Sequence, residues 1–216
     1  MTKKKAITRP DHIKVIFVEG DADEIIIDKL ISYYRSNGLK KQPKIINTHG
    51  FPDEKKMRQG LTKLNMCSKT PVEFDAVVCE YDTDIFEKGI QQEPDWKKVE
   101  KNLKQNHNVT SFCRIQAKTS IEDWMLDDLE GLLKALDLPL DTQPKGQYGQ
   151  DKVKALFRRK NIVYDRHKGR EKIKPYLDKL DIAKIREARK KELKGFEKIL
   201  GVKGFGNNNS KKNSVL

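Results

Sequence analysis

The sequence predicts an α/β fold: a mainly parallel sheet of four strands flanked by helices, followed by a basic helical region. Two observations lead to this prediction. Short apolar runs typical of buried strands recur through the first half of the chain, and segments of helix length separate them. The last third shows helical patterns rich in lysine and arginine, with no further strand.

The first two strands and helices have clear boundaries. Residues 14–18 form an apolar run that ends in a Glu-Gly turn, and the helix predicted over 21–36 ends at an Asn-Gly pair. Residues 44–48 form a second short strand, closed by His-Gly. The helix predicted over 53–69 places its apolar residues on one face. This alternation of strand and helix favours parallel pairing.

The second half of the sheet follows the same order. An apolar run predicts a strand over 75–81, and a helix follows over 95–105. The fourth strand is predicted over 109–115. A helix then begins after Ser120, the expected N-cap.

The chain divides into four parts by composition. The α/β pattern is followed by a turn-rich linker, by a basic region with helices over about 150–160, 169–179 and 181–200, and by an Asn-, Ser- and Lys-rich tail that we expect to be disordered. The predicted parts are residues 12–136 (α/β domain), 137–149 (linker), 150–203 (basic helical region) and 204–216 (tail).

Composition excludes some classes of protein. No apolar run approaches the roughly 18 residues that a membrane span requires, and the basic N-terminus lacks the apolar segment of a signal peptide. Cys67, Cys79 and Cys113 are odd in number and widely spaced. We therefore expect a cytoplasmic protein with reduced thiols.

The net charge of +13 is unevenly distributed. Residues 1–150 contain 24 Lys and Arg against 24 Asp and Glu, whereas residues 151–216 contain 21 against 8. A neutral body joined to a basic region favours a polyanionic partner such as nucleic acid. The alternative is a set of solvated helix faces kept soluble by lysine.

Acidic residues follow two of the predicted strands. Glu19 ends the first apolar run, and Asp82 and Asp84 end the third. Open α/β sheets place their chemistry at the carboxyl ends of strands, so these side chains predict one acidic, metal-binding site. Asp82 and Asp84 would share one face of an extended segment. The alternative is two ordinary helix N-termini, where acids are favoured anyway.

These residues carry a resemblance to a known family. The Glu19 strand end, the Asp82-x-Asp84 strand end and the alternation between them resemble a Toprim domain over about residues 12–136. The segments Val18 to Glu24 and Lys118 to Trp124 are most similar to the overcoming-lysogenisation (OLD) branch, which includes Toprim nucleases of bacterial anti-phage defence. The resemblance implies a divalent-metal-dependent endonuclease that uses Mg²⁺ or Mn²⁺, with two ions.

The resemblance also implies roles for individual residues. Glu19 would be the central metal ligand or the base, and Asp82 and Asp84 would hold one ion between them. Asp23, one helical turn after Glu19, would reach the second ion, with Glu24 as the alternate.

Two later residues complete the expected site. Lys118 follows the fourth strand and would neutralise the scissile phosphate or the leaving oxyanion, unless it is a solvated loop lysine. Glu122, one helical turn later, would join the metal ligands.

The basic region supplies candidate nucleic-acid contacts. Basic residues interleaved with a tyrosine suit contacts with phosphates and the stacking of one nucleobase. The alternatives are a lysine-rich helix-loop-helix and a docking site for a partner protein. The expected contacts are Arg158, Arg159, Lys160, Tyr164, Arg166, Lys168 and Arg170.

The predicted function is therefore cleavage of DNA or RNA, tRNA included. Because the chain carries no ATPase motif, we expect it to act beside an ATPase subunit, as the effector of a defence system; this step rests on analogy alone. Two alternatives remain: a catalytically silent nucleic-acid-binding Toprim module, and a receiver-like phosphorelay domain.

Overall fold

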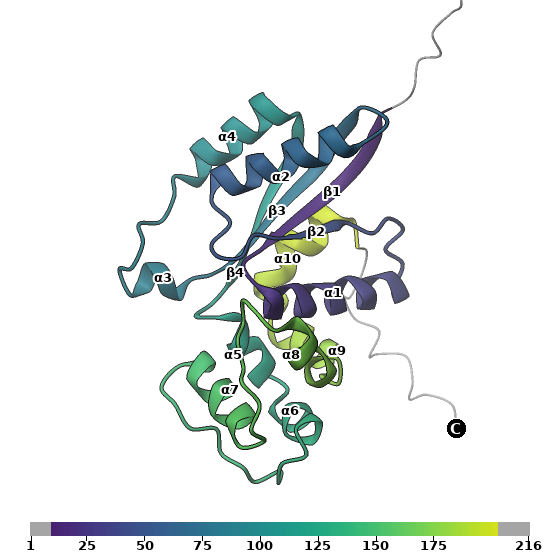
Figure 1. Ribbon diagram of the computed structural model, residues 1–216. Coiled ribbons are helices and arrows are strands. Elements are labelled where there is room, and N and C mark those ends of the chain that lie inside the picture. The colour runs from purple at the N-terminus through teal and green to yellow at the C-terminus, as the bar shows by residue number, and fades with distance from the viewer. Residues whose placement is uncertain (1–9, 203–216) are drawn as a thin grey trace, which may run out of the picture.

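A computed structural model describes residues 10–202 of the chain, and its centre is a sheet of four parallel strands. The strand order is β2-β1-β3-β4. This confirms the predicted α/β fold with a parallel sheet flanked by helices (Figure 1). The strands are β1 (Asp11–Val18), β2 (Lys44–Asn47), β3 (Val72–Asp82) and β4 (Val109–Ala117).

Helices α2 (Glu54–Cys67) and α4 (Trp96–His107) cover one face of the sheet (Figure 1). Their apolar side chains form one core with alternate residues of the strands, such as Phe17 of β1 and Tyr81 of β3. Successive side chains of a strand point to opposite faces, so the residues between them belong to the other core. Each strand is therefore buried on both sides, which accounts for the apolar runs in the sequence.

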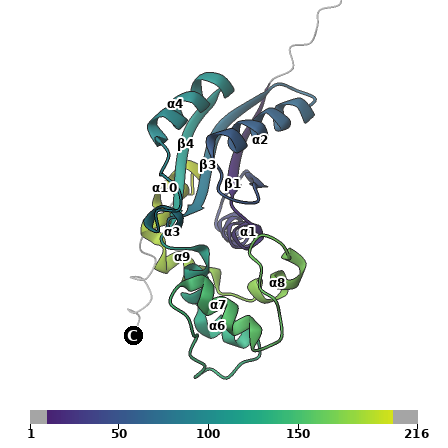
Figure 2. The same cartoon turned by 60° about the vertical axis from the view of Figure 1, so that its left-hand side comes forward.

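The other face carries the first helix and the C-terminal helices. Helix α1 (Asp21–Ser36) packs there beside α10 (Lys190–Leu200), and α10 contacts β4. Figure 2 shows helices α5 to α9 gathered below the carboxyl ends of the strands. These are α5 (Ile121–Leu126), α6 (Leu129–Ala135), α7 (Gly149–Arg158), α8 (Arg170–Leu177) and α9 (Ile182–Ala188).

The basic helical region shares its core with the α/β part. Apolar residues of α7 to α10 belong to the same buried cluster as Ile16 of β1 and the isoleucines of α1. Helices α8 and α9 both contact α1. The tail predicted over residues 204–216 lies outside the described residues. Within the described part, no helix combines the length and the apolar character needed to cross a membrane.

The helix predicted over residues 181–200 is wrong in one respect, because the structure has two helices there. Helix α9 ends at Ala188, and α10 begins at Lys190. Between them, the Arg189 guanidinium lies 2.5 Å from an Asp127 carboxylate oxygen, and it also donates to the Asp123 carbonyl at 3.2 Å. These long-range bonds fix the backbone at the break.

The end of α10 is fixed to the first strand. Lys14 Nζ donates to the carbonyl oxygens of Ile199 and Leu200, both at 2.9 Å. The last carbonyls of a helix have no partner within the helix, and a cation there is favoured by the helix dipole. Lys14 therefore joins β1 to the end of α10, which packs on the same face of the sheet as Ile16.

We expect Lys14→Met to lower the free energy of unfolding by about 1–3 kcal/mol, because two carbonyls lose a charged donor. Urea unfolding followed by circular dichroism would measure the change. Lys40→Met, at an exposed position, is the matched control. Equal stability of the two variants would contradict the role assigned to Lys14.

Candidate functional site

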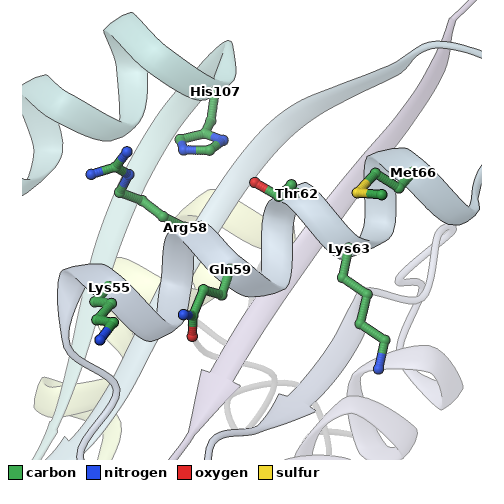
Figure 3. A pocket seen from close by; sticks show the side chains of 7 residues that line it. All are labelled: Lys55, Arg58, Gln59, Thr62, Lys63, Met66 and His107. Carbon is green, nitrogen blue, oxygen red and sulfur yellow. The ribbon is translucent and has the colours of Figure 1, made fainter.

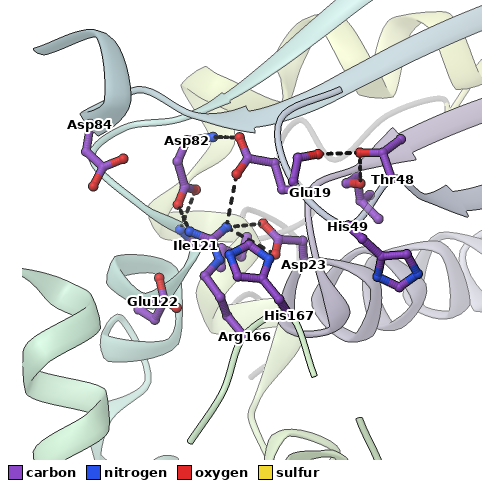
Figure 4. A network of polar contacts seen from close by, with 12 residues as sticks. Glu19, Asp23, Thr48, His49, Asp82, Asp84, Ile121, Glu122, Arg166 and His167 are labelled. Atoms are coloured by element: carbon purple, nitrogen blue, oxygen red, sulfur yellow. Dashed lines mark hydrogen bonds and ion pairs between the residues drawn. The ribbon is translucent and has the colours of Figure 1, made fainter. Parts of the chain in front are cut away.

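The candidate site lies where the direction in which the chain adds strands to the sheet reverses. From β1 the chain moves to β2 on one side, and it then returns to β3 on the other side of β1. Ligand sites of open α/β sheets lie at such a switch point, beyond the carboxyl ends of the strands. Glu19 directly follows β1 and Asp82 is the last residue of β3, so both belong to this edge (Figure 4).

Three buried carboxylates form the centre of the site. Asp23, Glu80 and Asp82 each offer an oxygen within 4.8 Å of the others. Glu80 is fully buried, and neither of its carboxylate oxygens has a hydrogen-bond partner. Glu80 is not among the site residues predicted from the sequence. The available signal was its spacing from Asp82, because residues two apart in a strand share one face.

Glu19 and Glu122 extend the cluster on two sides. The backbone N–H of Asp82 donates to Glu19 Oε1 at 3.3 Å. Tyr164 donates its hydroxyl to Glu122 Oε1 at 2.9 Å, whereas Glu122 Oε2 is buried without a partner. Burial is the main reason why the pKa of Glu122 is raised. All these carboxyl groups are therefore withdrawn from water.

One cation lies among these acids. Arg166, in the loop between α7 and α8, contacts Asp82 through Nη1. Its Nη2 donates to the two carboxylate oxygens of Asp23 at 2.9 and 3.2 Å, and it lies 3.6 Å from Glu19 Oε2. Figure 4 shows the guanidinium between these carboxylates. Arg166 was expected from the sequence to contact nucleic acid, and no local pattern links it to residues 84 or 143 positions away.

Gly20 lets this loop approach the start of α1. The Arg166 carbonyl accepts hydrogen bonds from the N–H groups of Asp21 at 2.7 Å and Ala22 at 3.2 Å. A Cβ at position 20 would lie 2.6 Å from that carbonyl oxygen. The glycine after Glu19 thus provides space for the loop that carries Arg166.

Burial controls the charge of the cluster. It raises the pKa of Glu19 to about 7, and the nearby Asp23 acts in the same direction, whereas Arg166 opposes it. Burial also holds the pKa values of Glu80 and Asp82 well above their usual range. The single guanidinium is therefore not sufficient to keep every carboxyl in the cluster ionised at neutral pH.

We expect the stability of the metal-free protein to depend on pH through Glu19. Its folded pKa of about 7 lies above the ordinary 4.5, so between these values the folded state holds a proton that the unfolded chain has released. Stability from this group is present at low pH and is lost as pH rises to 7. Burial lowers the pKa of His107 and His167, and these groups act in the opposite direction below about pH 6.5.

Comparison with Glu19→Gln isolates this effect. Unfolding free energies in urea and EDTA at pH 5, 6 and 7 should fall more steeply for the wild type than for the variant. Parallel profiles would contradict a raised pKa at Glu19.

Two predicted site residues lie apart from the cluster. The expectation that Asp82 and Asp84 share an extended segment is wrong, because the strand ends at Asp82 and Asp84 begins the short helix α3 (Asp84–Glu87). Asp84, which Figure 4 shows away from the other carboxylates, pairs with Lys88 at 2.7 Å. Lys118 does follow β4 as predicted, but its side chain is exposed.

The choice between Asp23 and Glu24 has a geometric answer. Asp23 is fully buried in the cluster, whereas Glu24 is half-buried and pairs with Arg170. The structure does not place Tyr164 at the surface, where a stacked base would need it. Tyr164 is buried and its hydroxyl faces Glu122, and Arg166 is buried likewise. The exposed members of the predicted basic set are Arg158, Arg159, Lys160 and Lys168.

The cluster fits a hard divalent cation. Three buried carboxylate oxygens, two of Glu80 and one of Glu122, have no donor, and a bound cation would supply their missing partner. An all-oxygen donor set suits Mg²⁺ or Mn²⁺, which prefer carboxylate ligands.

Comparisons with known proteins do not identify this chain. It matches no protein family model, and no curated protein or solved structure is similar to it at a significant level. Its function is therefore argued from the site.

Proposed function

We propose that this protein is a divalent-metal-dependent nuclease built on a Toprim-like α/β domain. The observation that carries the proposal is the buried group of Asp23, Glu80 and Asp82 at the switch point of the sheet, with Glu80 unpaired. Buried carboxylates without partners are costly, and proteins retain them where they bind a cation or do chemistry. The resemblance of the Glu19 and Asp82 strand ends to Toprim motifs supports the same conclusion.

The chain's own residues have separate roles in this proposal. Asp23, Glu80 and Asp82 would hold the cation, with Glu19 and Glu122 at its sides. When bound, one or two Mg²⁺ or Mn²⁺ ions would lower the pKa of an attacking water and stabilise the leaving oxygen. Glu19 and Asp82 stand at strand ends, and Asp23 and Glu122 lie in the first turns of α1 and α5. Glu80 lies within β3, two residues before its end.

Two further residues would act on the reacting groups. Glu19 is placed to accept a proton from the attacking water. Lys118, exposed at the same edge of the sheet, would attract the scissile phosphate.

The setting is part of the proposal. We place the protein in the cytoplasm, where Cys67, Cys79 and Cys113 would stay reduced. The substrate would be DNA or RNA, and an ATPase subunit would act as partner in a defence complex.

The decisive experiment is a cleavage assay with the purified chain. Supercoiled plasmid, single-stranded DNA and tRNA would be incubated with Mg²⁺, Mn²⁺ or EDTA. We expect cleavage of at least one substrate with either metal and none in EDTA. Glu80→Gln, purified in parallel, is the matched control for a contaminating nuclease. Cleavage that persists in EDTA, or in Glu80→Gln, would remove the metal mechanism.

A catalytically silent nucleic-acid-binding module is the second candidate. The observation that favours it is Arg166, which already supplies a cation to Asp23 and Asp82. Binding without cleavage in Mn²⁺ would support it. A phosphorelay receiver is less favoured, because its phosphorylated Asp must be accessible and Asp82 is fully buried.

A further inference from the structure

Arg166 occupies the part of the site where a metal ion would bind. Its guanidinium contacts Asp82 and Asp23, which are two of the three residues that offer closely spaced carboxylate oxygens. A divalent ion would use the same oxygen lone pairs. Like charges about 4 Å apart repel by roughly 4 kcal/mol at an effective dielectric constant near 20, and a divalent ion doubles this. The two cations therefore compete for one position.

The guanidinium also explains how the acidic cluster can be buried without metal. An unpaired charge inside a protein costs several kcal/mol. Burial alone disfavours the charge on Arg166, but Asp23, Asp82 and the neighbouring acids hold its pKa above the ordinary value. Arg166 thus remains charged and neutralises part of the cluster.

The backbone of the Arg166 loop is held by its own hydrogen bonds, whereas the guanidinium is held only by carboxylates. The Arg166 carbonyl accepts from two N–H groups at the start of α1, and the Asp21 carboxylate accepts from the N–H groups of Gly169 and Arg170 at 3.1 and 3.0 Å. By contrast, Arg166 Nε is buried without a partner. The end of the side chain is therefore held only by the carboxylates that a metal would take.

We propose that Arg166 is a tethered counter-ion of the metal site, and that a divalent ion binds by displacing its guanidinium from Asp23 and Asp82 while the loop backbone stays in place. This inference rests on the proposed metal site. The free energy of metal binding would then be the difference between two interactions of the carboxylates, one with the divalent ion and one with the guanidinium of Arg166. In low metal the site would be closed by the chain itself.

Metal affinity measured directly tests this proposal. Mn²⁺ would be titrated into the wild type, Arg166→Gln and Arg170→Gln by calorimetry. Arg170 lies in the same region but pairs with Glu24 outside the three-carboxylate group, so its variant controls for the loss of one positive charge. We expect Arg166→Gln to bind Mn²⁺ at least tenfold more tightly than the wild type, and Arg170→Gln to stay within about twofold. Unchanged or weaker binding by folded Arg166→Gln would overturn the proposal.

Thermal unfolding gives a second readout. Metal-free Arg166→Gln should melt at a lower temperature than the wild type, and Mn²⁺ should raise its melting temperature by more. If the metal-free variant is unfolded, Mn²⁺ must restore a cooperative transition, and failure to do so would overturn the proposal. Tighter Mn²⁺ binding by the variant without nucleic-acid cleavage would uphold this inference and reject the nuclease function. Absence of Mn²⁺ binding by both folded proteins would reject the metal site itself.

A second surface, on the outer face of α2, is a candidate site for nucleic-acid binding that does not depend on Arg166. The outer face of α2 and the end of α4 form an open pocket lined by three cationic residues and by His107, with no acidic residue in the lining (Figure 3). Every lining residue on α2 is exposed, and Met66 has 80% of its surface free. The residues that line it are Lys55, Arg58, Gln59, Thr62, Lys63, Met66 and His107.

The geometry of this pocket suits a phosphodiester backbone. Lys55 and Lys63 are eight positions apart on one helix, about 12 Å at 1.5 Å per residue, which is the axial rise of roughly three to four nucleotides of a DNA strand. The loop before α2 also contacts the acidic site, because the N–H of Gly50 donates to the Glu19 carbonyl at 2.6 Å. We infer that the nucleic-acid backbone lies along α2, in the pocket of Figure 3. This inference rests on the proposed function for the identity of the polyanion.

Two charge reversals of equal size test this surface. Lys55→Glu with Lys63→Glu would be compared with Arg158→Glu with Arg159→Glu, at exposed positions of the basic region. The probe is a fluorescein-labelled single strand of DNA or RNA, followed by anisotropy at several salt concentrations in EDTA. We expect the α2 pair to weaken binding at least tenfold and to reduce the salt slope by about 1.4, as two lost phosphate contacts require.

The outcomes separate this inference from the nuclease function. An equal or larger loss in the Arg158 and Arg159 variant, or no loss in the α2 variant, would overturn the α2 surface. If the wild type binds neither strand, the nucleic-acid function fails as well. Mn²⁺ affinity should be the same in the α2 variant and the wild type, and a loss there would reject the variant as evidence for a separate surface.

Discussion

Asp82→Asn should reduce phosphodiester cleavage by at least a hundredfold while the protein remains folded. The substitution removes a ligand charge that Arg166 contacts, but it keeps the shape of the side chain. Oδ1 of the new side chain can still accept the hydrogen bond from the Ile121 N–H, which measures 2.9 Å in the wild type. A hundredfold loss corresponds to about 2.7 kcal/mol of activation free energy. Initial cleavage rates in Mn²⁺, with circular dichroism as a check of folding, would measure it.

Asp84→Asn is the matched control for Asp82→Asn. The residue is two positions away and also acidic, but it begins α3 and pairs with Lys88. We expect its cleavage rate to stay within about threefold of the wild type, a barrier change of roughly 0.6 kcal/mol. A loss as large as that of Asp82→Asn would show that Asp82 and Asp84 together hold the metal ion, as predicted from the sequence. The three-carboxylate group of Asp23, Glu80 and Asp82 would then not be the metal site.

A chain that ends at residue 150 should not fold. Helices α7 to α10 contribute fully buried apolar side chains to the core beneath β1 and α1, including Phe157, Ile173 and Phe196. Removing one buried aromatic side chain costs about 3–5 kcal/mol, and a whole domain is stable by only about 5–15 kcal/mol. Loss of all four helices therefore exceeds the total stability.

Solubility and thermal unfolding would test this expectation. A chain that ends at residue 202 keeps every described core residue and is the control. A soluble fragment 1–150 with a cooperative unfolding transition would show that the basic region is a separate unit, as its charge suggested. Because truncation disrupts the core, nucleic-acid binding by the basic region has to be tested by surface substitutions instead.

The sequence was sufficient for the sheet and for part of the site. The four strands are local apolar runs, and Glu19 and Asp82 follow two of them, so a local rule locates them at one edge. Glu80 was missed although its two-residue spacing from Asp82 places both side chains on one face of the strand. Its role is visible only once α1 places Asp23 beside it.

Arg166 and Asp84 show why the rest was not predictable. The partners of Arg166 lie 84 and 143 positions away, and nothing in its own segment specifies them. Its neighbours suggested a solvent-facing basic run, but the tertiary fold buries the side chain. For Asp84, the strand was expected to continue and a turn into α3 ended it. Sequence patterns thus located the acidic strand ends, but not the cation that packs among them.

The bond between Lys14 and the end of α10 has a consequence for biosynthesis. Lys14 and its first acceptor are separated by 185 positions, so this contact cannot form until α10 has been synthesised. Arg166 likewise reaches Asp23 across 143 positions. Contacts of such long sequence separation form late, because loop closure must precede them. We therefore expect a nascent chain in which Arg166 is still inside the ribosome to lack the completed acidic site, and a nuclease site would be assembled only after that residue has emerged.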